Sequence, residues 1–111
     1  MFRRAVARRA SLLTTDLVLA EVHRLLLFRA GPRAAARALD RFESSAHVTI
    51  EFPTAVHHHA ARAWLDRLAD HAITYTDAVS FAVMQAIHCT AALSFDHDFR
   101  IAGFSLWTAE P

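Results

Sequence analysis

The chain has 111 residues, of which 54% are hydrophobic, with two glycines, three prolines and one cysteine. This composition excludes a disordered, collagen-like or disulfide-stapled protein, and the length suits a single domain. The twelve basic residues, all arginines, nearly balance eleven acids. The resulting net charge of +1 does not indicate a particular class of binding partner. No apolar run reaches the roughly 18 to 20 residues of a membrane span, so we expect a cytoplasmic protein without membrane association.

Helices are predicted for most of the first 45 residues. At the start of the chain, Phe2, Val6 and Leu13 would share one face of a helix. The segment "TTDLVLAEVHRLLLFRAGP" begins with capping threonines and ends in Gly-Pro, which predicts a helix from about Asp16 to Arg29. Another helix should follow in "PRAAARALDRFESS", residues 32–45.

Short strands alternate with helices in the remainder. The segment "HVTIEF", residues 47–52, is rich in β-branched residues and stops at Pro53, which indicates a strand. Helices are predicted in "TAVHHHAARAWLDRLADH" and "YTDAVSFAVMQAIHC", and strands in "AALSF" (91–95) and "FSLW" (104–107). Alternating helices and strands imply crossover connections, so the predicted class is α/β with a parallel sheet covered by helices.

Two acids occupy unusual places in the predicted helices. Glu21 interrupts an apolar stripe in the middle of its helix, although a pair with Arg24 at i+3 would also account for it. Asp77 begins the helix after Thr74, where an acid can simply support the cap or the helix dipole. Each acid taken alone is better explained by these structural roles.

Two further acids, Asp96 and Asp98, follow the strand at 91–95, at the edge of the sheet where ligands bind in parallel α/β folds. Separately, Asp96 could cap a turn and Asp98 could be a solvated turn acid. Taken together with Glu21 and Asp77, they could converge on a hard divalent cation. Mg²⁺ and Mn²⁺ prefer such oxygen ligands.

The stretches "TTDLVLAEV", "YTDAVSFAVM" and "ALSFDHDF" followed by "GF" resemble, in this order, the PIN domain and especially the VapC toxins of bacterial type II toxin–antitoxin systems. The resemblance implies a three-layer fold with a short parallel sheet and a Mg²⁺- or Mn²⁺-dependent endoribonuclease. It assigns Glu21, Asp77 and Asp96 as catalytic metal ligands and Asp98 as an additional acid. It also implies RNA as substrate, a cognate antitoxin as partner and a homodimer.

One feature of the family pattern is missing from the sequence. PIN domains normally begin with an apolar strand that ends in an acid followed by Thr or Ser, and this chain has no acid before Asp16. We therefore expect one PIN-like domain over residues 1–111 that lacks the first strand and helix. Two alternatives remain open: an inactive remnant that only dimerises or binds an antitoxin, and an unrelated helical binding module.

The run of three histidines, His57 to His59, resembles a metal-binding motif, but it is a weak candidate for a metal site. Consecutive residues of a helix point about 100° apart and cannot converge on one ion. His97, between the two acids of the turn, could contact substrate or carry a proton, but a solvated turn histidine is the simpler interpretation.

Overall fold

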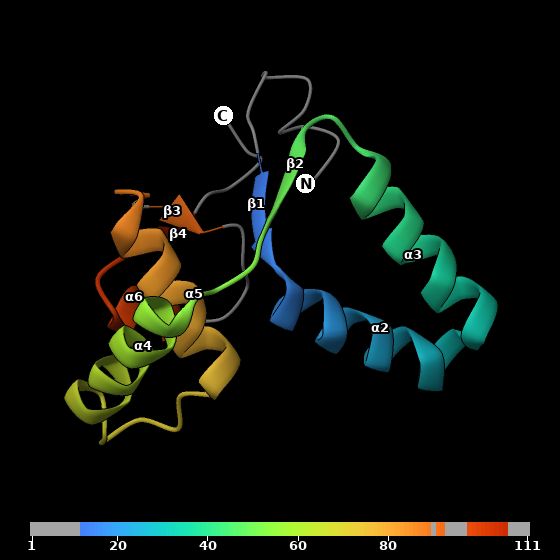
Figure 1. Cartoon of the computed structure of the whole chain (residues 1–111). Coiled ribbons are helices and arrows are strands. Elements are labelled where there is room, and N and C mark those ends of the chain that lie inside the picture. The colour runs from blue at the N-terminus through green and yellow to red at the C-terminus, as the bar shows by residue number, and fades with distance from the viewer. Residues whose placement is uncertain (1–11, 90, 93–97, 107–111) are drawn as a thin grey trace. The chain divides into compact units, whose positions relative to one another are not determined.

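The computed structural model describes residues 12–89, 91–92 and 98–106 (Figure 1). The chain divides into two compact units, one up to Phe52 and one from Pro53 onward. We call them the N-terminal unit and the C-terminal unit and describe each by itself. None of the helices in the described ranges is both long enough and apolar enough to cross a lipid bilayer.

The N-terminal unit is a strand–helix–helix–strand arrangement. Its elements in chain order are β1 (Leu12–Thr15), α2 (Asp16–Ala30), α3 (Pro32–Ser44) and β2 (Val48–Glu51). The two strands pair in parallel, in a register that runs from Leu12 opposite Val48 to Thr15 opposite Glu51. The two helices form the crossover between the strands and pack against each other (Figure 1).

Local signals in the sequence account for the bounds of the two helices. Thr15 caps α2, because its hydroxyl accepts a hydrogen bond from the backbone N–H of Val18 at 3.3 Å. Gly31 ends the helix with φ of 94° and donates its N–H to the carbonyls of Leu26 and Leu27. Pro32 then starts α3. The predictions for α2 and α3 are confirmed to within one residue at each end.

The prediction of a helix over residues 2–13 is wrong at its C-terminal end, where the structure has a strand. Residues 12 and 13 belong to β1, and residues 1–11 lie outside the described part of the chain. The backbone N–H of Leu12 donates to the carbonyl of His47 at 2.8 Å, at the start of the strand pair. The apolar spacing of this segment also suits a helix, so pairing with β2 decides its structure.

The C-terminal unit consists of α4 (Ala55–Arg67), α5 (Tyr75–Ala86), β3 (Ala91–Ala92), α6 (Asp98–Ile101) and β4 (Ser105–Leu106). The strands β3 and β4 pair in parallel. Both predicted helices are shorter than expected at their C-terminal ends, and α6 is not predicted. The predicted strands at 91–95 and 104–107 are confirmed only for their described residues, since residues 93–95 and 107 lie outside the described ranges.

Aromatic rings form the core of the C-terminal unit. Phe81 on α5 is fully buried and makes an edge contact with Phe99 of α6, with ring centroids 4.9 Å apart. Trp64 of α4 lies against Phe81 and Phe104, at 5.4 and 5.9 Å. Helices and parallel strands occur in both units, so the predicted α/β class is confirmed.

Candidate metal centre

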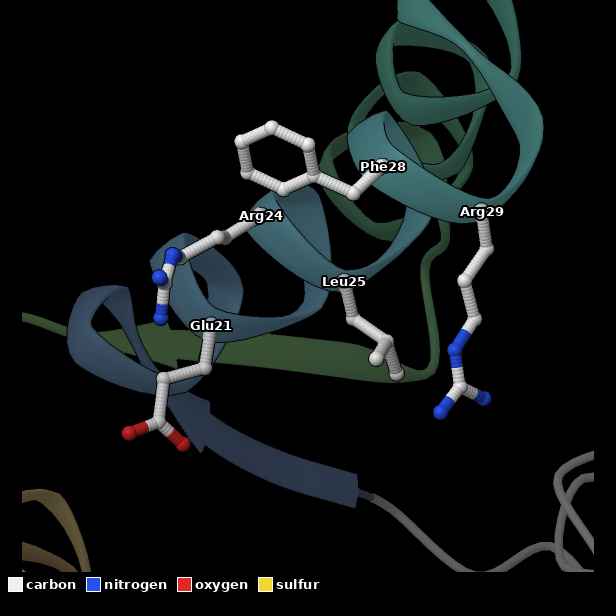
Figure 2. Close-up of a pocket in the computed structure, with 5 residues that line it drawn as sticks. All are labelled: Glu21, Arg24, Leu25, Phe28 and Arg29. Carbon is white, nitrogen blue, oxygen red and sulfur yellow. The ribbon is translucent and has the colours of Figure 1, made fainter.

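Glu21 lies in the second turn of α2, and its side chain is exposed in the N-terminal unit. Glu21 does not form the expected ion pair with Arg24. The guanidinium of Arg24 lies near Phe28, 6.0 Å from its ring centroid. Figure 2 shows Glu21, Leu25 and Phe28 along one side of the helix. Leu25 is 50% and Phe28 78% exposed, so this side is open in its unit and is not a buried apolar stripe.

Asp77 lies in the first turn of α5 and is half-buried. Its backbone N–H donates to the hydroxyl of Thr74 at 3.1 Å, so the predicted cap is present. This bond uses the backbone of Asp77, not its carboxylate. Capping and metal binding are therefore compatible roles for the same residue, and the positive end of the helix dipole favours its negative charge.

Asp98 begins α6 and is half-buried, whereas Asp96 lies outside the described residues. The next residue, Phe99, is buried against Phe81. Phe81 follows Asp77 by one helical turn. The contact between the two rings therefore holds α6 against α5, and these are the helices that carry Asp98 and Asp77.

The four predicted acids are divided between the two units, and one of them lies outside the described residues. Within the described ranges, no group of three or more Asp, Glu, His or Cys residues could hold a metal ion. Glu21 belongs to the N-terminal unit, Asp77 and Asp98 belong to the C-terminal unit, and Asp96 is not described. The shared metal centre therefore stays a prediction.

A fifth acid, Asp16, was missed as a site residue by sequence reasoning. It is the first residue of α2 and follows the carboxyl end of β1, the edge at which parallel sheets bind ligands. Its Oδ1 atom is buried and has no hydrogen-bond partner within the described part of the chain. A buried carboxylate oxygen is stabilised when a cation or a hydrogen-bond donor lies nearby. Carboxylate oxygens such as this one are the donors that a hard divalent cation prefers.

The histidine run has structural contacts of its own. Nδ1 of His57 accepts the backbone N–H of Thr54 at 3.0 Å, which completes a capping box at the start of α4. Nδ1 of His58 lies 2.7 Å from the hydroxyl of Tyr75, and the two rings are stacked. These contacts tie His57 to its own helix and His58 to α5.

A parallel α/β fold with carboxylates at helix starts and strand ends is shared by PIN-domain proteins. The PIN domain family matches residues 2–105, and the chain belongs to this family. It is 39% identical over 92 residues to the 23S rRNA-specific endonuclease VapC20 of Mycobacterium tuberculosis, strains CDC 1551 and H37Rv. The match spans 83% of this chain and 70% of that protein.

The same relative is similar in three dimensions. The crystal structure of M. tuberculosis VapC20, a sarcin-ricin loop cleaving toxin, matches with a TM-score of 0.81 and 37% identity. The match covers 92% of this chain and 78% of that one. The predicted PIN-like fold and the resemblance to VapC toxins are therefore confirmed. VapC toxins act on RNA and pair with VapB antitoxins, and PIN-domain nucleases generally depend on divalent metals.

Proposed function

We propose that the chain is a metal-dependent endoribonuclease and the toxin of a type II toxin–antitoxin system. The observation that carries the proposal is its 39% identity to an rRNA endonuclease over 83% of its length. The acids Glu21, Asp77, Asp96 and Asp98 fall within the stretch matched by the PIN family. The inactive remnant, which would bind only an antitoxin or a second copy, is not favoured by this likeness.

The ion that we propose is Mg²⁺ or Mn²⁺. Glu21, Asp77 and Asp96 would bind it through carboxylate oxygens, and Asp98 would assist through water or a second ion. When bound, such an ion polarises the scissile phosphate and activates water for attack. The acids supply the negative charge that holds the cation, and nearby arginines would hold the RNA backbone.

The partner that we propose is a cognate antitoxin with a basic side chain that enters the acidic site. Four carboxylates in one cleft repel one another unless a cation or an arginine neutralises them. Co-purification with the product of the adjacent small gene tests this pairing, and failure of the two proteins to associate would contradict it. We also propose that the toxin forms a homodimer, which sedimentation of the purified chain tests.

Cleavage of RNA by the full chain tests the function directly. The relative acts on 23S rRNA, so this RNA is the first substrate to offer, with Mg²⁺, with Mn²⁺ or with a chelator. We expect fragments only with a divalent ion. Asp96→Asn and Glu21→Gln should abolish them, while Glu43→Gln, an exposed acid on α3, should cleave normally. Unchanged cleavage by Asp96→Asn would overturn the assigned site.

A further inference from the structure

One exposed side of α2 combines arginines with an unpacked aromatic ring. Its residues recur at the spacing of a single helix face and line a hollow of about 320 Å³: Glu21, Arg24, Leu25, Phe28 and Arg29 (Figure 2). All of them belong to the same helix of the N-terminal unit. The described residues that line the hollow therefore all belong to that unit.

Phe28 does not belong to the buried core of the described residues. It is 78% exposed, more than any other large hydrophobic side chain in the described part of the chain. The guanidinium of Arg24 lies 6.0 Å from its ring centroid, a cation–π distance that leaves most of the ring open. Arg29, the next residue, adds a second cation to the same face of the helix, with its side chain directed away from the ring (Figure 2).

We propose that this face of α2 binds single-stranded RNA, with an unpaired base stacked on Phe28 and adjacent phosphates on Arg24 and Arg29. Aromatic rings and arginine planes are the usual platforms for unstacked RNA bases, and arginine forks suit phosphate. The inference rests on the proposed function and deepens it. It assigns the substrate-binding residues that the sequence alone left open.

The charges of the face favour RNA over an apolar partner. Arg24 lies about midway between Glu21 and Phe28 along the helix, and Arg29 directly follows Phe28. Glu21 and Phe28 are seven positions apart, which is about 10 Å along the helix axis. A short extended stretch of RNA spans that distance, so a base held on Phe28 would place the next phosphates near the proposed metal ligand. A helix or a second copy would find only two apolar side chains here, Leu25 and Phe28, beside three charged ones.

RNA binding measured without metal tests this inference independently of cleavage. The full chain is titrated, in a chelator, into short single-stranded RNAs that carry 2-aminopurine at each position in turn. The fluorescence of this base falls when it stacks. We expect quenching at one position, and Phe28→Leu should abolish it and weaken binding roughly 5- to 100-fold. Phe28→Tyr should keep both effects, because the ring is retained.

The arginines are tested by the salt dependence of the same binding. Each of Arg24→Gln and Arg29→Gln should lower the slope of log affinity against log salt by about 0.7. Arg37→Gln, an exposed arginine of α3, is the matched charge control and should leave binding and quenching unchanged. Phe52→Leu replaces another exposed phenylalanine, 67% accessible, and is the control for loss of a ring.

The outcomes distinguish this inference from the proposed function. If the chain cleaves RNA but Phe28→Leu binds and quenches like the wild type, the RNA surface is wrong and the nuclease stands. If Phe28→Leu instead changes the oligomeric state on size exclusion, a second copy covers the face and the inference is overturned. If the wild type binds no RNA in chelator, the inference also fails, whereas the nuclease is judged by cleavage with metal.

Discussion

The indole N–H of Trp64 donates a hydrogen bond to the side-chain oxygen of Gln85 at 3.2 Å, from α4 to α5. Trp64 is only 5% exposed and lies against both Phe81 and Phe104. Arg67 covers its ring, with the guanidinium carbon 4.2 Å from the centroid. This one side chain therefore connects the two long helices of the C-terminal unit by a polar and an apolar contact.

We expect Gln85→Ala to lower the free energy of unfolding by about 1 kcal/mol, because the buried indole N–H loses its acceptor. Trp64→Ala should cost about 3 to 5 kcal/mol through the cavity that it leaves. Urea unfolding of the variants measures both values. In a double-mutant cycle with Trp64→Phe, the coupling to Gln85→Ala should be about 0.5 to 1 kcal/mol. A coupling near zero would show that the hydrogen bond contributes nothing.

His88 should be a site at which glycine stabilises the protein. It follows α5 with φ of 57°, the left-handed region that side chains with a Cβ disfavour. The N–H of Cys89 donates to the carbonyl of Met84 and that of His88 to Gln85, which is the hydrogen-bond pattern of a Schellman cap. We expect His88→Gly to raise the free energy of unfolding by about 0.5 to 1 kcal/mol.

The matched variant at this position is His88→Val, which should destabilise because a β-branched residue fits the left-handed region poorly. Thermal unfolding ranks the three proteins. If glycine does not stabilise, the imidazole of His88 makes a contact that outweighs the backbone strain.

The opposite effect is expected at Gly31, between α2 and α3. Its φ of 94° and ψ of 171° lie in a region that is almost restricted to glycine. A Cβ built there would meet no atom of the described residues within 4 Å apart from its chain neighbours, so the cost of a side chain is conformational. Gly31→Ala should lower the free energy of unfolding by about 1 to 3 kcal/mol. Ala36→Gly on the exposed side of α3 is the control, with a cost of about 1 kcal/mol from helix propensity.

Helix α2 could be predicted from the sequence because both of its ends are set by neighbours in the chain. Thr15 caps the start through its own hydroxyl, and Gly31 supplies the backbone conformation at the end. The strand β1 could not be predicted in the same way. Its residues Leu12 and Leu13 fit either a helix or a strand, and the partner strand starts at Val48, far along the chain. Pairing over that distance leaves no local signal.

The candidate site was also predictable only in its local features. The places of Glu21 and Asp77 on helices were predictable, whereas Asp98, expected in a turn after a strand, begins the unpredicted helix α6. Their convergence depends on how distant elements come together, which no local pattern contains. Asp16 was missed for a related reason. An acid after two threonines is typical of a helix start, and only the structure shows that one of its oxygens is buried without a partner in the described residues.

The last prediction concerns metal-linked stability, which tests the carboxylate set without any RNA. An ion that binds only the folded protein stabilises it by RT ln(1 + [L]/Kd), about 2.7 kcal/mol at 100 times Kd. We therefore expect Mn²⁺ to raise the melting temperature of the full chain relative to chelator. Glu21→Gln should unfold within about 0.5 kcal/mol of the wild type in chelator, because the side chain is exposed and forms no ion pair with the described residues.

With Mn²⁺, the same variant should lose most of the stabilisation, since one ligand of the ion is gone. Glu43→Gln carries the same change of charge at an exposed position of α3 and should keep the full metal effect. The comparison matters because Glu21 belongs to one unit and Asp77 and Asp98 to the other. If Glu21→Gln and Asp77→Asn each remove the Mn²⁺ effect, one ion is held by both units. If only Asp77→Asn does so, Glu21 is not a ligand, and the site lies within the C-terminal unit.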